Sequence, residues 1–359
     1  MALADVWSSG LEPADVCAFL FPGTGSSGVP DLRALAQAAP GARQVVEDVV
    51  DAVQEGVPRA GWPSLREILL IDPASYREAA RTPGVAQLAG YTASVAVDRV
   101  LRSAGVRPGL AVGQSFGEIA ALVCAGAFGV GDGARMAVSL VGVLASRGAG
   151  GGMGLLEAGE DDTARLIERA GEPQVVVACL NAPQVTVVSG PDAALDRVLA
   201  AAREGGTRAV RLAVPYLSHH PAMAGADDEW YKIISGFGQR PLRVPVYSPV
   251  RGRAYGDDDD LHRALADCIV KPVRLPQALV AAREAGVTVF AEAGAGGALT
   301  QCARLAVPGA RTLVPLRELP RASSGAPPVG KSSPSVPAAD PPGEASSSGS
   351  AGPAAEGRR

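Results

Sequence analysis

The chain has 359 residues, of which 47% are hydrophobic and 19% are charged, and its net charge at neutral pH is −4. This length gives room for one large domain or two modest ones, and the composition is typical of a globular enzyme. The small net charge argues against a nucleic-acid partner or a polybasic membrane contact, and no apolar run reaches the roughly 20 residues of a membrane helix.

Cysteine and histidine usage narrows the chemistry. The five cysteines are scattered without a CxxC pair, which predicts reduced thiols in the cytoplasm rather than disulfides or a metal site. The N-terminus lacks the basic and apolar regions of a secretory signal. Of the three histidines, His219 and His220 follow a predicted strand, whereas His262 comes after four aspartates, where a solvated surface position is expected.

In the first half of the chain, strands and helices alternate. After a loose leader at 1–14, residues 16–21 predict a buried strand that stops at a Pro-Gly pair. Residues 85–104 have helical periodicity, 110–112 form a short strand, and a helix follows over 116–125. This alternation predicts an α/β fold with a mostly parallel sheet that has helices on both faces.

A different order of elements begins near residue 148. The sequence predicts strands at 153–157, 175–180, 184–189 and 208–214, separated by helices at 161–170 and 191–204. This strand-helix-strand-strand-helix-strand order is that of a ferredoxin-like unit. We therefore expect a small ferredoxin-like subdomain at 148–214, inserted in a large subdomain formed by 15–147 and 215–320.

The last part of the chain has a different composition. From residue 321 it is rich in Ser, Pro, Ala and Gly and has almost no large apolar side chains. Such a segment cannot bury enough surface to offset the entropy of ordering, so residues 321–359 are expected to be disordered.

A candidate nucleophile lies between a predicted strand and a predicted helix. Residues 113–117 read GQSFG and fit the G-x-S-x-G pattern. The glycines permit a sharp turn that exposes the hydroxyl of Ser115 at a helix N-terminus, where free N–H groups can stabilise an oxyanion. The alternative is a chance glycine-rich turn, which the flanking strand and helix disfavour.

A serine hydroxyl needs a general base near neutral pH. His219 and His220 belong to the segment YLSHHPAM, just after a predicted strand. A lone histidine is more often structural than catalytic, but the serine turn requires a partner. The sequence therefore favours this strand end as the source of the base.

Further motifs accompany the serine and the histidine. They are FPGTGS at 21–26, GQSFGE at 113–118, NAP at 181–183, SHHPAM at 218–223, KPVR at 271–274 and EAGAG at 292–296. In this order they resemble motifs of malonyl-CoA:acyl-carrier-protein transacylases and of polyketide synthase acyltransferase domains. The family motifs are FPGQGS, GHSxGE, N-x-P, SHSPxM, NPVxW and EVGPG, and the resemblance runs from about residue 16 to about residue 318.

The resemblance implies a fold and a mechanism. The family fold is an α/β-hydrolase-like core with a ferredoxin-like insert, in agreement with the order of elements. The implied enzyme is a ping-pong acyltransferase in which Ser115 attacks a thioester, His219 accepts its proton, and a second thiol removes the acyl group. By the match, the backbone N–H groups of Thr24 and Phe116 form the oxyanion hole, and the backbone carbonyl of Cys268 orients the histidine. No bound cofactor is implied, because the thiol carrier is CoA or the 4′-phosphopantetheine of a carrier protein.

One departure from the family bears on the substrate. Members that use malonyl or methylmalonyl units carry an arginine at a fixed spacing after the serine, and its guanidinium binds the substrate carboxylate through two hydrogen bonds. Counting from Ser115 places Leu140 there. Arg135 lies more than a turn away, and Arg147 would need an insertion in the helix. Leucine donates nothing to a carboxylate, so we expect an acyl group without one, unless another arginine takes over.

Other positions complete the predicted pocket. Tyr216 and Ser218 belong to the tetrad YLSH, which resembles the YASH of methylmalonyl-type domains and keeps a small residue before the histidine. Gln114 stands where the family has histidine, and it can still donate hydrogen bonds but cannot titrate. The match also places Asn181 in the pocket.

The predicted function is transfer of a non-carboxylated acyl group (starter, aminoacyl or dipeptidyl) to or between acyl-carrier proteins in polyketide and antibiotic biosynthesis. Discrete family members without the arginine relay such groups in macrolactam pathways, and the tail in place of fused synthase domains favours an enzyme acting in trans. A polyketide synthase loading module is a further expected partner.

Three rival functions stay open. A thioester hydrolase would use the same Ser-His dyad. A malonyl or methylmalonyl transacylase is opposed by Leu140, and an inactive carrier-binding scaffold is opposed by the intact Ser115 and His219.

Overall fold

The computed structural model describes residues 7, 11–24, 29–38, 40–57 and 61–318. The predicted tail at 321–359 lies outside the described residues, as does most of the predicted leader. Trp7 is described, and it is fully buried in the hydrophobic core, which a loose leader does not predict.

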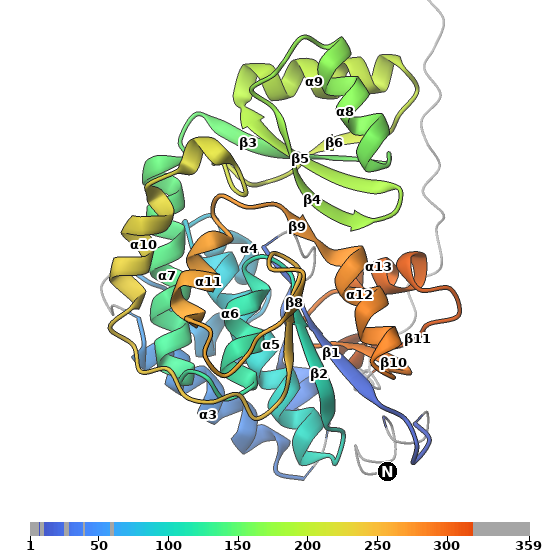
Figure 1. Cartoon of the computed structure of the whole chain (residues 1–359). Coiled ribbons are helices and arrows are strands. Elements are labelled where there is room, and N and C mark those ends of the chain that lie inside the picture. Colours follow the sequence, from blue (N-terminus) through green and yellow to red (C-terminus); the bar gives the residue numbers. More distant parts are fainter. Residues whose placement is uncertain (1–6, 8–10, 25–28, 39, 58–60, 319–359) are drawn as a thin grey trace, which may run out of the picture. The chain divides into compact units, whose positions relative to one another are not determined.

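A six-stranded sheet forms the large subdomain (Figure 1). Its strands are β1 (Cys17–Phe21), β2 (Pro108–Gly113), β7 (Val246–Ser248), β8 (Arg253–Ala254), β10 (Val289–Glu292) and β11 (Arg311–Leu313). They lie in the order β11-β10-β1-β2-β7-β8, parallel from β11 to β7, with β8 antiparallel to β7. The predicted mostly parallel sheet is confirmed.

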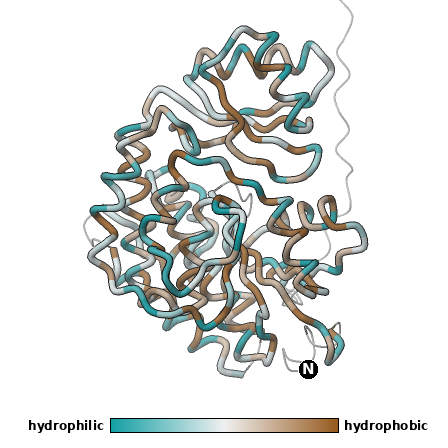
Figure 2. Tube along the Cα trace, in the orientation of Figure 1, coloured by the Kyte–Doolittle hydropathy of each residue, from teal (hydrophilic) through white to brown (hydrophobic). Residues whose placement is uncertain are grey.

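Helices cover both faces of this sheet, because its strands are apolar on both sides. Phe19 and Phe21 of β1 face the larger core, whereas Ala18 and Leu20 pack with the opposite helices, as the two-residue period of a strand requires. The hydrophobic colouring of Figure 2 runs along β1 without a break. The helices are α2 (Arg33–Gln37), α3 (Ala42–Glu55), α4 (Tyr76–Ala79), α5 (Val85–Ser103), α6 (Gly117–Cys124), α7 (Val130–Arg147), α10 (Ala226–Ile234), α11 (Leu261–Asp267), α12 (Leu275–Glu284), α13 (Ala298–Ala306) and α14 (Pro315–Glu318), with the short turns η1 (Glu67–Ile71) and η2 (Pro221–Met223).

A second sheet belongs to the small subdomain, drawn at the top of Figure 1. Its elements in chain order are β3 (Gly151–Leu156), α8 (Glu160–Arg169), β4 (Val176–Ala182), β5 (Val185–Pro191), α9 (Asp192–Glu204) and β6 (Ala209–Arg211). The strand order is β6-β3-β5-β4, with antiparallel neighbours, which is the predicted ferredoxin-like unit.

A fifth strand joins this sheet from outside the predicted small subdomain. β9 (Val273–Arg274) pairs in parallel with β4, although it lies in the range assigned to the large subdomain. Sequence reasoning missed it because two residues are too few to show a periodicity. The small sheet is thus tied to the chain that follows α11, which matters for the site below.

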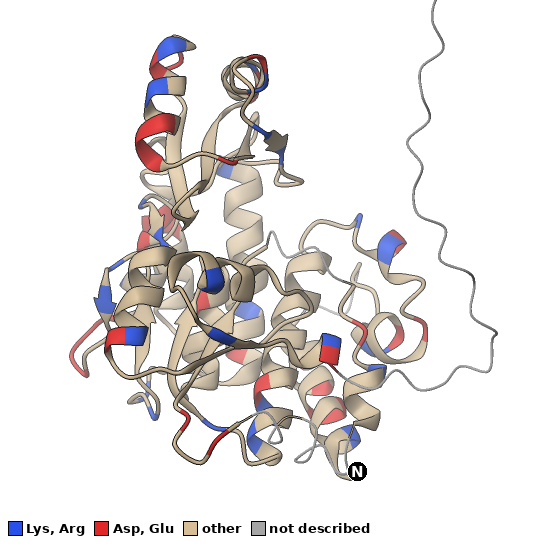
Figure 3. Cartoon of the chain, turned by 90° about the vertical axis from the view of Figure 1, so that its right-hand side faces the viewer, with Lys and Arg blue, Asp and Glu red and all other residues tan. Residues whose placement is uncertain are grey.

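Two observations concern the surface of the described residues. Within them, no helix is long and apolar enough to cross a membrane. Figure 3 shows Lys and Arg interspersed with Asp and Glu on the helices, while the strands are mostly uncharged. Arg251, Arg253 and Arg274 are each paired with a carboxylate.

Candidate active site

Ser115 stands at the sharp turn between β2 and α6. Its φ is +55°, in the left-handed region, and the flanking glycines make room for that turn. A Cβ at Gly113 would overlap the backbone of Glu118, and a Cβ at Gly117 would overlap the carbonyl of Phe21. Because both glycines are required sterically, the G-x-S-x-G pattern here is a structural necessity and not a chance turn.

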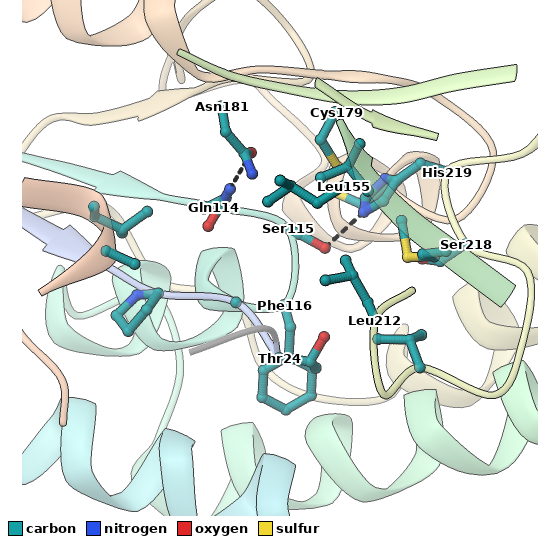
Figure 4. Close-up of a pocket in the computed structure, with 18 of the residues that line it drawn as sticks. Thr24, Gln114, Ser115, Phe116, Leu155, Cys179, Asn181, Leu212, Ser218 and His219 are labelled. Atoms are coloured by element: carbon teal, nitrogen blue, oxygen red, sulfur yellow. Dashed lines mark hydrogen bonds between the residues drawn. The ribbon is translucent and has the colours of Figure 1, made fainter. Parts of the chain in front are cut away.

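His219 reaches the serine from the loop that follows β6. Its Nε2 lies 2.6 Å from the Oγ of Ser115, and its ring is almost wholly buried (Figure 4). The φ of His219 is +53°, and His219 and Ser115 are the two non-glycine residues with positive φ among those the structure describes. Backbone strain therefore falls on the two residues whose side chains meet.

The other ring nitrogen of His219 bonds to main chain. Its Nδ1 donates to the carbonyl of Lys271 at 3.1 Å, and the carbonyl of Cys268 also accepts from the ring. The sequence pointed to Cys268 alone, whereas the structure adds the carbonyl of Lys271. Backbone acceptors carry no side-chain signal, although the KPVR motif that begins at Lys271 marked the segment.

Burial lowers the pKa of His219 to about 4, and the hydrogen bonds to the Lys271 and Cys268 carbonyls act in the opposite direction. The imidazole is therefore neutral at physiological pH. With Nδ1 protonated and donating to a carbonyl, Nε2 presents a lone pair to the hydroxyl of Ser115. This is the protonation state that a general base requires.

The predicted oxyanion residues flank the serine from two elements. Phe116 directly precedes α6, so its N–H belongs to the unsatisfied N-terminal end of that helix. Thr24 follows β1, and its neighbour Gly23 approaches so closely that an added Cβ would lie 2.8 Å from the carbonyl of Gln114. The two backbone segments thus converge beside Ser115, where the oxyanion hole is predicted.

A cavity of about 540 Å³ opens at the hydroxyl of Ser115. It brings together all the predicted site residues: Thr24, Gln114, Ser115, Phe116, Leu140, Asn181, Tyr216, Ser218, His219 and Cys268. Its other walls are largely apolar and were not predicted, among them Leu144, Met153, Leu155, Leu212 and Trp230. Figure 4 shows Leu155 and Leu212 facing the space beside Ser115.

The structure shows whether another arginine reaches the cavity in place of the one missing at position 140. Leu140 lines the cavity, whereas Arg135 pairs with Asp132 and Arg147 pairs with Glu229, both with half-exposed side chains. Among the described residues that line the cavity, Arg208 is the one arginine. Its side chain is 72% exposed and bonds to Glu157 at 2.6 Å, so it lies at the rim with its charge already paired.

A hydrogen bond joins the two subdomains at the site. The Nε2 of Gln114 donates to the Oδ1 of Asn181 at 2.5 Å, and thus links the serine turn to β4 (Figure 4). The glutamine amide can make this contact in the one orientation that presents its N–H₂ group. Gln114 therefore links the serine turn to the small subdomain by a hydrogen bond, and its amide cannot titrate and so cannot act as a general acid.

The two remaining histidines are structural. His220 donates from Nε2 to the carbonyl of Gln174 and accepts at Nδ1 from the N–H of Ala222, so both ring nitrogens are used. His262 is buried, packs its ring against Phe128 and donates to the carbonyl of Phe237. The expected surface position of His262 is wrong, because this helix turns that face into the core.

Comparison with known proteins agrees with this geometry. The family model described as the acyl transferase domain matches residues 18–317. The chain belongs to the acyl transferase domain family. It is an acyltransferase, with the α/β-hydrolase-like large subdomain and ferredoxin-like small subdomain of that family.

Three relatives illustrate the match. Polyketide synthase GfsB of Streptomyces halstedii is 33% identical over 79% of this chain, but the match spans only 5% of that protein. The malonyl-CoA:acyl carrier protein transacylase of Xanthomonas oryzae is 30% identical with a TM-score of 0.74, over 83% of this chain and 93% of that one. A malonyl-transacylase solved with its type II polyketide synthase acyl-carrier protein is 26% identical with a TM-score of 0.73, over 83% and 94%. The chain thus spans a small part of the curated synthases and nearly all of the solved transacylases.

Proposed function

We propose that this acyltransferase carries an acyl group without a terminal carboxylate on Ser115 and transfers it to or between acyl-carrier proteins. The observation that supports this most is the apolar cavity beside Ser115, with Leu140 in its wall and its one lining arginine paired at the rim. An ionised carboxylate buried there would lack a partner and would cost several kcal/mol.

The proposed chemistry has two halves. In the first, His219 takes the proton of Ser115 as Oγ bonds to the thioester carbonyl, and the C–S bond breaks with return of the proton to the leaving thiolate. In the second, His219 takes the proton of an incoming thiol, whose sulfur attacks the ester carbonyl, and the C–O bond breaks as His219 returns the proton to Oγ of Ser115. The 2.6 Å contact between Nε2 and Oγ and the neutral imidazole support both steps.

The thiol in each half would belong to the phosphopantetheine of a carrier protein, or to CoA for the donor. The resemblance to a transacylase solved with its carrier protein supports this choice of partner. The five cysteines are free, which suits the reducing environment of the cytoplasm. A role in trans within a polyketide pathway, with a loading module as a further partner, belongs to the same proposal.

A panel of thioesters tests the proposal by the mass added to the intact protein. Malonyl, methylmalonyl, acetyl, longer acyl and aminoacyl groups are offered on CoA and on a carrier protein, with Ser115→Ala as the control. We expect neutral or aminoacyl groups to label the native chain and not the control. Preferential labelling by malonyl would overturn the assignment of the substrate. Rapid loss of the label to water without carrier protein would favour the hydrolase, and no label at all would favour the inactive scaffold.

A further inference from the structure

A buried carboxylate that the reaction scheme does not use lies on the helix of the nucleophile. Glu118 follows Ser115 by one helical turn on α6, and its side chain is wholly buried. Its carboxylate accepts hydrogen bonds from the hydroxyl of Tyr255 at 2.6 Å and from the hydroxyl of Ser248 at 3.0 Å. The thiol of Cys268 interacts with it as well, while its own hydrogen bond goes to the carbonyl of Ala264 at 3.8 Å. Among the described residues, no Lys or Arg forms a direct ion pair with it, and a buried carboxylate without one is unusual enough to require a reason.

Two neighbours of Glu118, Cys268 and Ser248, connect it to the main chain that contacts the ring of His219. Cys268 is itself one of the two residues whose carbonyls accept from the imidazole. Ser248 also accepts from the N–H of Arg251, whose guanidinium reaches Asp267 at 3.1 Å. Asp267 in turn bonds to the ammonium of Lys271 at 2.7 Å.

The segment 268–271 is therefore held at both ends. At its start Cys268 lies beside Glu118, and at its end Lys271 is tied to Asp267 by its ammonium and by its N–H, which donates to the Asp267 carbonyl at 2.9 Å. Between them the carbonyl of Ile269 accepts from the N–H of His220 at 3.1 Å. The position of the imidazole thus depends on the position of this segment.

We propose that Glu118 is a positioning residue, which holds the segment Cys268–Lys271 so that its carbonyls keep His219 directed at Ser115. Because Glu118 and Ser115 are carried by the same turn and helix, one rigid element fixes the nucleophile directly and its base through the carboxylate. This inference rests on the proposed role of Ser115 and His219.

The charge of Glu118 matters to this role. Burial raises its pKa to about 7, while hydrogen bonds from Tyr255 and Ser248, the positive charge of Arg251 and the nearby thiol of Cys268 act to lower it. These are the charged and polar groups that face it from β7, the turn between β7 and β8, the residue after β8 and the residue after α11. An ionised carboxylate can accept from the hydroxyls of Tyr255 and Ser248 at once, whereas the protonated form gives up an acceptor position. The ionised form is therefore the one that holds the segment.

Glu118→Gln tests the role, with Asp98→Asn as the matched control. Asp98 is also a buried carboxylate, but it pairs with Arg102 on α5 and does not line the cavity. We expect Glu118→Gln to slow acylation of Ser115 roughly 10- to 100-fold at saturating thioester, with little change in KM, because a misdirected base is costly. The control is expected to acylate at the native rate once the folded fraction is matched by denaturant titration.

The pH dependence separates positioning from a general loss of structure. The native rate should fall as pH drops through about 7, where Glu118 takes up a proton, and fall again near 4, where His219 does. Glu118→Gln should lack the upper step. Tyr255→Phe removes a bond that lowers the pKa of Glu118, so it should move that step to higher pH.

A spectroscopic readout does not depend on the substrate. With only three histidines in the chain, nitrogen NMR can follow the tautomer of His219 in the resting protein. The native protein should show Nδ1 protonated, and Glu118→Gln should show a mixture of tautomers. Native rates, an unchanged upper pH step and an unchanged tautomer in Glu118→Gln would overturn the inference. If the native chain is not acylated at all, the proposed function fails, while the NMR comparison still decides the role of Glu118.

Discussion

The large and small subdomains make different contributions to the same cavity. The large subdomain supplies the two strained residues, the tight glycines and the carbonyls that orient the imidazole. The small subdomain supplies one face of a sheet, with Met153 and Leu155 of β3 directed to the cavity. The other face of that sheet packs under α8 and α9 through residues such as Leu156 and Val188.

This difference indicates a division between reactivity and choice of substrate. The two residues with strained backbone, Ser115 and His219, belong to the large subdomain. Small displacements of either would affect every substrate equally. Among the described lining residues of the small subdomain, the charged ones are Glu157 and Arg208, which pair with each other at the rim. Changes on that side, and at Leu140 opposite, should alter which acyl group is accepted.

The largest expected effect is on reactivity. His219→Ala should slow acylation of Ser115 about 10⁴-fold or more for every thioester, because removing one member of such a unit removes most of its effect. The matched control is His220→Gln, since His220 is also buried but uses both ring nitrogens in structural bonds. The rate of acylation of both variants is measured by stopping the labelling reaction at set times and reading the mass of the intact protein. A loss of rate confined to one class of acyl group would contradict the proposed division between reactivity and choice of substrate.

An intermediate effect is expected on selectivity. Leu140→Arg should raise labelling by malonyl relative to acetyl by roughly tenfold to hundredfold, since charge-assisted hydrogen bonds contribute about 1.5–3 kcal/mol. Leu144→Arg is the matched control, because Leu144 lines the same cavity about one turn further along α7. Competition between the two thioesters measures the ratio. An equal gain in both variants would mean that any positive charge suffices and that Leu140 has no special place.

The smallest effect is expected at the rim. Arg208→Ala should change the ratio of malonyl to acetyl labelling by less than about twofold, because an exposed ion pair contributes under about 1 kcal/mol. Glu157→Gln should be equally mild, although it frees the guanidinium of Arg208. A collapse of malonyl labelling in Arg208→Ala would identify this arginine as the carboxylate partner and would remove the argument from Leu140.

Local sequence signals predicted much of this molecule, and their limits are visible in particular residues. The parallel sheet and the ferredoxin-like insert follow from the order of the predicted strands and helices. The turn at Ser115 follows from the flanking glycines, which are required sterically. By contrast, His262 was expected on the surface and is buried, since four preceding aspartates say nothing about which way the helix faces. β9 was missed because its two residues become a strand only through pairing with β4.

By itself, the sequence determined the order of elements, the nucleophile turn and the absence of an arginine at position 140, because each depends on residues close together in the chain. Only the tertiary structure decided which atoms meet across long separations. Ser115 and His219 are 104 residues apart, and Glu118 and Tyr255 are 137 apart. The groups that accept hydrogen bonds from the imidazole are backbone carbonyls, which every residue possesses, so the residue type does not indicate which of them do so. Their selection comes from packing, which places the end of α11 between the buried carboxylate and the base.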